Sequence, residues 1–156
     1  MYDEIMLLHE DYLGDAEKPL RIKSIHDHLR EVGLLDQMMK LDSVASSVIV
    51  RDDGFHKFPA QTTVHNPADV NKIERIVVKL EQRENKKVFQ ESLYYCKETL
   101  NAAKVASDSV MSAVCEVLDE ESPRSRSFCI VRPPGHHAHA HHHHGFCFFN
   151  NVALGA

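Results

Sequence analysis

Histidine dominates the end of the chain, where seven of its twelve histidines lie between Ile130 and Gly145. This segment reads IVRPPGHHAHAHHHHG. A neutral imidazole with a pKa of about 6.5 can take a proton from water near neutral pH, and it can also bind a transition metal. The segment therefore indicates a catalytic loop, a metal site or a polar surface loop.

Two adjacent histidines, His136 and His137, differ from the others because a restricted backbone leads into them. Pro133 and Pro134 fix their own φ angles, and Gly135 permits a tight approach of the chain. The two imidazoles would then be presented in a defined place, which favours a catalytic role. A pair of histidines that only caps a loop is the alternative.

The remaining histidines of the segment, residues 139 and 141–144, would bind transition metals weakly in almost any protein. A structural zinc site needs about four ligands in tetrahedral geometry, and consecutive loop residues do not converge easily on one ion. We therefore interpret residues 141–144 as a solvated loop insertion without a specific ion. No metal ligand is assigned within this chain.

The upstream sequence predicts helices separated by a turn-rich loop. Pro19 suits the first turn of a helix within residues 17–35, and Gly33 suits the turn just after its end. Residues 51–70 are rich in turn formers and read as a surface loop region. A short helix is expected near residues 69–79.

The next part of the sequence predicts half of an α/β unit. Apolar residues at steps of three, four or seven indicate a long amphipathic helix from Phe89 to Val117. Residues 128–132, FCIVR, have the composition of a buried strand, and we expect this strand to be central and parallel, with helices on both faces of its sheet. The histidine segment would then lie at the strand's carboxyl end. Asn150 or Asn151 is expected to cap a final helix.

Charge and cysteine spacing exclude several function classes. The formal net charge of -5 comes from interspersed charges that form no basic stripe, so direct nucleic-acid binding is not expected. The four cysteines contain no C-x-x-C pair, and neither a signal peptide nor an apolar run of about 20 residues is visible. We expect a soluble protein with reduced thiols, without a membrane partner, in the nucleus and/or cytoplasm.

Two blocks in order, VRPPGHHA and GFCFFNNVA, resemble the zinc-dependent histone deacetylase family, and specifically its class II-like branch. Upstream, AAKVASDSVMSAVCEVL resembles the family's long helix, and EKPLRIKSIHDHLREVGLL resembles its opening segment. The resemblance implies an arginase/deacetylase-like three-layer α/β fold, with a parallel sheet flanked by helices. Residues 1–156 would be the N-terminal portion of that catalytic domain, and we expect them to be truncated.

The resemblance also implies roles for four residues. His137 would be the general base for the water that attacks the acetyl-lysine amide, and His136 would be its electrostatic partner. Gly145 and Phe146 match positions that line the narrow tunnel for the acetyl-lysine side chain, whose methylenes gain by leaving water. The zinc ligands and the catalytic tyrosine of the family would lie downstream of residue 156.

The implied activity is the removal of acetyl groups from lysines of histones or other proteins by zinc-activated water. The resemblance also implies a role in chromatin regulation and transcription repression, with a corepressor complex as a partner. A catalytically inactive deacetylase-like scaffold and a histidine-rich metal-binding protein are the alternatives, and action on acetylated polyamines is a variant of the leading hypothesis. Without the zinc ligands, we expect residues 1–156 alone to be inactive and prone to aggregate.

The first prediction concerns the histidine tract. Replacing residues 141–144 with Ser and Gly should leave deacetylation by the complete protein within a few-fold, because none of the four matches a catalytic position. Steady-state turnover of an acetyl-lysine peptide measures this effect. A loss as large as that caused by changing His137 would place the tract inside the active site.

Overall fold

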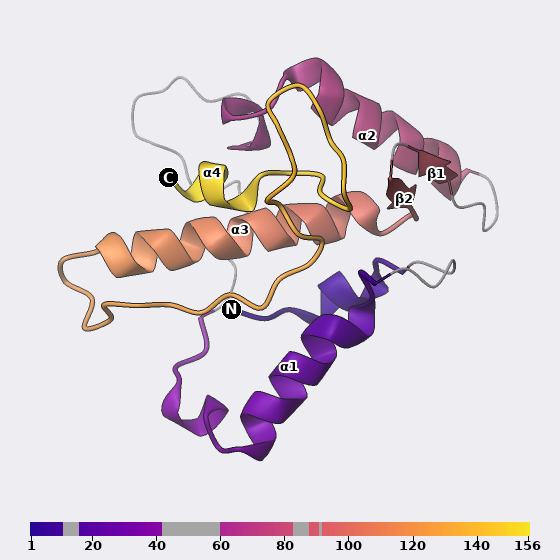
Figure 1. Ribbon diagram of the computed structural model, residues 1–156. Coiled ribbons are helices and arrows are strands. Elements are labelled where there is room, and N and C mark those ends of the chain that lie inside the picture. Colours follow the sequence, from indigo (N-terminus) through magenta and orange to yellow (C-terminus); the bar gives the residue numbers. More distant parts are fainter. Residues whose placement is uncertain (11–15, 42–59, 83–87, 91) are drawn as a thin grey trace.

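The structure is a computed structural model that describes residues 1–10, 16–41, 60–82, 88–90 and 92–156. Helix α3 (Thr99–Leu118) runs through the middle of the molecule, with α2 (Pro67–Glu81) on one side of it and α1 (Pro19–Glu31) on the other (Figure 1). The short helix α4 (Asn151–Gly155) packs against α3. The remaining elements are three 3-10 helices and two strands: η1 (Glu4–Leu8), η2 (Leu35–Gln37), η3 (Ala60–Thr63), β1 (Val88–Gln90) and β2 (Leu93–Tyr95).

The predicted start and end of α1 are confirmed. Pro19 occupies the first turn of α1, and Gly33 has a φ of +72° just beyond its end. Asn66 caps α2 by accepting a hydrogen bond from the Ala68 main-chain N–H. Helix α2 is slightly longer than the predicted 69–79. Residues 51–59 of the turn-rich region lie outside the described residues, and its remaining residues include the 3-10 helix η3 and the start of α2.

The prediction of one long helix from Phe89 is wrong in its first part, because β1 and β2 occupy this stretch as an antiparallel hairpin. The three residues of β2 are all buried, so this strand is apolar on both faces and has no strand-like alternation. Such a short apolar run fits a helix and a strand equally well. Ser92, with a φ of +62°, forms part of the turn, and α3 begins only at Thr99.

Helix α3 separates two apolar clusters and is itself buried on most of its circumference. Ala103 faces the cluster formed with α2, β2 and the C-terminal segment: Val70, Ile73, Val77, Leu80, Leu93, Tyr95, Phe148 and Phe149. Ala106 faces the cluster formed with η1, α1 and residue 130: Met6, Ile22 and Ile130. Small side chains at 103 and 106 allow both layers to approach α3 closely.

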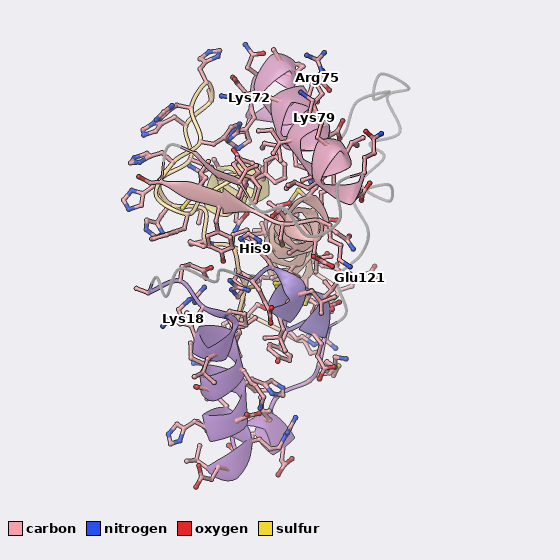
Figure 2. All side chains as sticks on the ribbon, turned by 90° about the vertical axis from the view of Figure 1, so that its right-hand side faces the viewer. His9, Lys18, Lys72, Arg75, Lys79 and Glu121 are labelled. Atoms are coloured by element: carbon pink, nitrogen blue, oxygen red, sulfur yellow. The ribbon has the colours of Figure 1, made fainter. Side chains whose placement is uncertain are left out.

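The outer side of α2 is basic. Lys72, Arg75 and Lys79 are exposed and project away from the core (Figure 2). They follow a helical spacing opposite to the buried positions of the same helix, which is the usual amphipathic pattern. No helix in the described part of the chain is long and apolar enough to span a membrane.

The prediction of a parallel strand at residues 128–132 is also wrong. These residues form no strand, and the described residues contain a single two-stranded antiparallel sheet. Met1 donates its amino group to the Phe128 carbonyl and accepts from the Ile130 N–H, at 2.9 and 3.0 Å. This is the hydrogen-bond pattern of one parallel pair, and it is too short to make a ladder. Ile130 is buried in the cluster with Met6 of η1 and Ala106 of α3, whereas Phe128 is 56% exposed.

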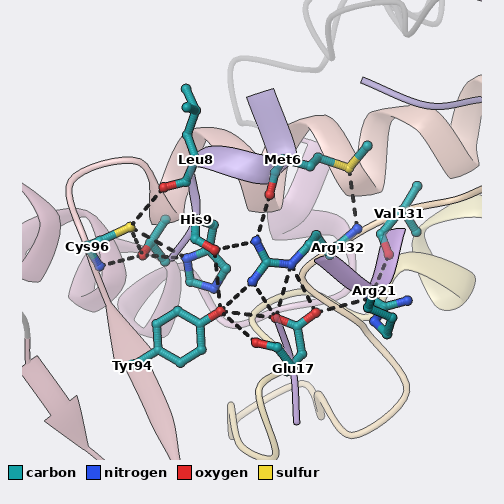
Figure 3. A network of polar contacts seen from close by, with 10 residues as sticks. Met6, Leu8, His9, Glu17, Arg21, Tyr94, Cys96, Val131 and Arg132 are labelled. Atoms are coloured by element: carbon teal, nitrogen blue, oxygen red, sulfur yellow. Dashed lines mark hydrogen bonds and ion pairs between the residues drawn. The ribbon is translucent and has the colours of Figure 1, made fainter. Parts of the chain in front are cut away.

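A buried arginine joins four separate parts of the chain (Figure 3). Arg132 is fully buried, and its Nη2 and Nε atoms donate to the Glu17 carboxylate, with Nη2 at 2.7 Å from Oε2. Nη2 also donates to the Tyr94 hydroxyl, and Nη1 donates to the main-chain carbonyls of Met6 and His9. All five N–H donors of the guanidinium therefore have acceptors.

The ion pair determines the charge state of Glu17. Burial alone would raise the pKa of this carboxyl, but hydrogen bonds and charge from Arg132, with those from Arg21, outweigh burial and lower the pKa below its usual 4.5. A pKa lowered in the folded state stabilises the fold above pH 4.5, and this contribution is lost as pH falls through the folded value.

The second prediction compares the two arginines on Glu17. Arg132→Met should lower the free energy of unfolding by about 3–5 kcal/mol, because it leaves a buried carboxylate without its main partner. Arg21→Met is the matched control and should cost about 1 kcal/mol or less, since Arg21 is 39% exposed. Urea unfolding of the chain measures both values.

The pH dependence gives a further check of the same pair. The Arg132→Met variant should lose less stability than the wild type as pH falls below 4.5, because the cause of the lowered pKa is gone. Equal losses for both arginine variants and parallel pH profiles would contradict the assigned role of Arg132.

Candidate active-site loop

Residues 132–150 form the loop that carries the histidine pair. The loop begins on the side of α3 where α1 lies, extends to the N-terminal end of α2 and returns to α4 (Figure 1). The Ala138 N–H donates to the Gly135 carbonyl at 3.1 Å, so His136 and His137 are the two central residues of a turn. Both side chains are exposed, with ring centroids 4.2 Å apart. The two imidazoles can therefore meet a ligand that approaches from solvent.

The start of the loop is packed tightly onto the beginning of α4. A Cβ at Gly135 would lie 2.6 Å from both the Asn151 main-chain nitrogen and the Phe149 carbonyl oxygen. The Asn151 side-chain amide donates to the Pro133 carbonyl at 3.4 Å. Glycine is thus required at 135 for close approach of two backbones, which holds the base of the turn in place.

Gly145 and Phe146 are the central residues of a second tight turn. The Cys147 N–H donates to the His144 carbonyl, and the φ angles of Gly145 and Phe146 are +59° and +66°. Positive φ at both central positions is characteristic of a type I′ turn, which glycine adopts easily and phenylalanine does not. The Phe146 N–H donates to the Ser92 carbonyl at 3.2 Å, so the β1–β2 hairpin supports this conformation.

The two turns meet at the His137 side chain. A Cβ added to Gly145 would lie 2.8 Å from Cδ2 of His137. The Cys147 thiol also links the two turns, because its Sγ accepts a hydrogen bond from the His137 N–H and donates one to the Gly145 carbonyl. Burial raises the pKa of the Cys147 thiol, which keeps the proton needed for that donation.

The histidine tract is folded rather than fully solvated, which corrects the interpretation of residues 141–144. His139 and His142 pair across a tight turn, and His143 is only 7% exposed. The His143 ring lies 5.4 Å from the His65 ring. Burial, and then the nearby His65, lower the pKa of His143. In the extended backbone after the turn, alternate side chains point to opposite sides, so one histidine of the tract faces inward.

Metal ligands do not converge in this part of the protein. Among the described residues, no three His, Cys, Asp or Glu side chains come together in an arrangement that could hold a metal ion. The structure brings His136 and His137 together and places Gly145 against the His137 ring, with Phe146 next to Gly145 in the same turn. The chemical roles of these residues stay predictions.

Comparison with known proteins assigns the chain to a family. The model of the histone deacetylase domain matches residues 15–156. The chain belongs to the histone deacetylase family. Its relatives include Histone deacetylase 18 of Arabidopsis thaliana, which is 34% identical over all of this chain, and Histone deacetylase 6 of Caenorhabditis elegans, which is 32% identical over 96% of it. The class II-like resemblance predicted from the motifs is confirmed.

The deacetylase relatives are much longer than this chain. The chain covers 22% of the Arabidopsis protein, 15% of the Caenorhabditis protein, and 21% of the human Polyamine deacetylase HDAC10, to which it is 29% identical. The crystal structure of an HDA15 HD domain matches 99% of this chain and 40% of that one, with a TM-score of 0.75 at 23% identity. This likeness shows that the chain has the deacetylase fold.

The supporting residues of the loop were missed at the sequence level. Arg132 is the exception that the sequence could have revealed, because an arginine inside an apolar run needs a buried carboxylate. Glu17, Ser92 and His65 contact the loop from distant parts of the chain. No local pattern marks such contacts, since they depend on how the elements pack.

The third prediction tests the contact between the two turns. Gly145→Ala should lower the free energy of unfolding by about 1–3 kcal/mol more than Gly33→Ala, because the new methyl group would meet the His137 ring. Gly33 is a matched control: its φ is +72°, but a Cβ there would meet nothing within 4 Å. Denaturant unfolding of the two variants gives the comparison, and equal costs would mean that the turns do not press on each other.

Proposed function

We propose that the protein removes acetyl groups from lysine side chains, with His137 as the general base. The observation that carries this proposal is the pairing of the two turns, which presents two exposed imidazoles beside Gly145 and Phe146 in a chain of the deacetylase family. Acetylated histones or other proteins are the proposed substrates, with corepressor complexes as partners and the nucleus and/or cytoplasm as the location.

Three residues of the chain have distinct roles in this proposal. His137 takes the proton from the water that attacks the acetyl carbonyl carbon, since a neutral imidazole suits this transfer near pH 7. His136, with its ring 4.2 Å away, offers a second imidazole that in its protonated form stabilises negative charge and can donate its own proton to the leaving amine, while His137 keeps the proton taken from water. Phe146 gives an apolar surface for the lysine methylenes, which favours their removal from water.

We include zinc as the cofactor in this proposal because the resemblance to the deacetylase family implies it. A bound zinc ion would polarise the amide carbonyl and lower the pKa of water from about 15.7 to about 7. The described residues do not themselves provide a set of ligands for it. We propose that the ligands follow residue 156, as the resemblance implies, and we assign none to this chain.

A second substrate class is favoured by one comparison. The human relative named Polyamine deacetylase HDAC10 matches 96% of this chain at 29% identity. An acetylated polyamine and an acetyl-lysine side chain share an amide at the end of an alkyl chain. Both would need the same general base, so peptide and polyamine substrates should be tested side by side.

The fourth prediction assigns the base. In a protein that carries this chain together with the zinc ligands, His137→Ala should lower kcat for an acetyl-lysine peptide by about 10²–10⁴. His142→Ala is the control, because His142 is also exposed in the loop but its ring contacts His144 rather than His137. It should change kcat by no more than a few-fold. Unchanged turnover in His137→Ala would remove the proposed base.

The same assay separates an enzyme from a scaffold. Residues 1–156 alone should hydrolyse no acetyl-lysine peptide above background, with or without added zinc. Zinc-dependent hydrolysis by these residues, abolished by a chelator, would contradict the placement of the ligands after residue 156. Absence of hydrolysis of both substrate classes by the longer protein would favour the scaffold.

A further inference from the structure

One buried histidine outside the loop, His65, contacts the loop and the start of α4 through its two ring nitrogens. His65 lies between η3 and α2 and is 2% exposed. Its Nδ1 is 2.9 Å from the His139 carbonyl oxygen, and its Nε2 is 2.9 Å from the Asn150 main-chain nitrogen. One imidazole therefore connects the residue two positions after His137 with the N-cap residue of α4.

The two partners determine the protonation state of His65. A main-chain N–H can only donate, so Nε2 must accept from Asn150. A carbonyl oxygen can only accept, so Nδ1 must carry the hydrogen that it donates to His139. Both bonds exist together only in the neutral form with the proton on Nδ1. A second proton on Nε2 would face the Asn150 N–H and break that bond.

The groups around His65 favour the same neutral state. Burial lowers the pKa of His65, against the opposing effects of its bond to the His139 carbonyl and of the Asp69 charge. The His143 ring lies 5.4 Å away, and the Phe149 ring lies 5.7 Å away. An imidazolium here would be poorly solvated, so the arrangement is built for a neutral ring.

His65 is the middle member of a row of three anchors. Three successive carbonyls just after the histidine pair, those of residues 138, 139 and 140, each accept a hydrogen bond from a residue outside the histidine tract. Their donors are the Asn150 side-chain amide at 3.0 Å, Nδ1 of His65 at 2.9 Å and the Asn66 main-chain N–H at 2.8 Å. The loop is thereby attached to the corner before α2 and to the start of α4. Two of these anchors also bind the main chain at the start of α4: Nε2 of His65 accepts from the Asn150 N–H, and the Asn150 side chain accepts from the Ala153 N–H.

We propose that His65 is a positioning residue for the His136–His137 turn, which it holds through a single neutral tautomer. Because the His65 ring is buried behind the loop, His65 would act on the position of the turn and would not touch the substrate. The structural part of this inference stands by itself. Its consequence for turnover rests on the proposed function, because a displaced turn would move His137 away from the reacting water.

The experiment combines a spectroscopic reading of the wild type with two variants. In nitrogen-labelled histidine NMR of the chain at pH 7, His65 should show a protonated Nδ1 and an unprotonated Nε2. His65→Phe keeps an aromatic ring but loses both hydrogen bonds, so the Asn150 amide should exchange with solvent roughly five- to tenfold faster, as expected for one lost hydrogen bond. His65→Gln keeps one donor and one acceptor and should restore much of the protection.

Two controls define the result. The Leu154 amide, which donates to the Asn150 carbonyl within the first turn of α4, should change less than the Asn150 amide in His65→Phe. His143→Phe replaces the neighbouring buried ring, which makes no hydrogen bond to His139 or Asn150 in the described structure, and should leave Asn150 exchange unchanged. An Nε2-protonated or charged His65 in the wild type, or unchanged Asn150 exchange in His65→Phe, would overturn the inference.

Turnover gives a separate reading. In a longer protein with deacetylase activity, His65→Phe should lower kcat with little change in KM, and His65→Gln should recover most of it. If the wild-type protein has no such activity, the proposed function fails while the exchange results still decide the inference. A normal kcat in His65→Phe with a faster Asn150 exchange would show that the anchor does not position the base.

Discussion

The buried ion pair between Arg132 and Glu17 is the constraint on which the rest of the structure depends. Taking both charges out of water is costly, and the cost is offset only when every donor of the guanidinium finds an acceptor. The acceptors come from η1, from Glu17 before α1 and from Tyr94 in β2, so these parts must assemble together. The next residues in the chain are the two prolines and Gly135, and the position of Arg132 therefore fixes where the histidine turn begins.

The histidine pair is thus held at both ends by groups that are themselves buried. Gly135 rests on the first residues of α4, and the carbonyls after the turn are bonded to the corner before α2. The second turn, at Gly145, presses on the His137 ring and is supported by the hairpin. Rigid support of this kind limits the positions available to two exposed imidazoles, which is what general base catalysis requires of a loop.

The sequence predicts the features that depend on local chemistry. Pro19 marks the start of α1, and Asn150 caps α4 as expected, because caps and first turns need only neighbouring residues. The hairpin at β2 and the segment 128–132, which joins no sheet among the described residues, differ from the prediction, since short apolar runs fit a helix, a strand or an extended segment equally well. The burial of His143 depends on a partner 78 positions earlier in the sequence, counted from residue 65 to residue 143, and no pattern near the tract could reveal it.

The central claim is that the supported turn presents His137 as the base for hydrolysis of an acetylated amine. A crystal structure of the longer protein with an acetyl-lysine peptide bound tests it most directly. The account predicts that the lysine methylenes lie against Phe146 and that a ring nitrogen of His137 lies at hydrogen-bond distance, about 2.6–3.2 Å, from the attacking water. A peptide bound away from the two turns, or a His137 ring directed away from the acetyl group, would contradict the account.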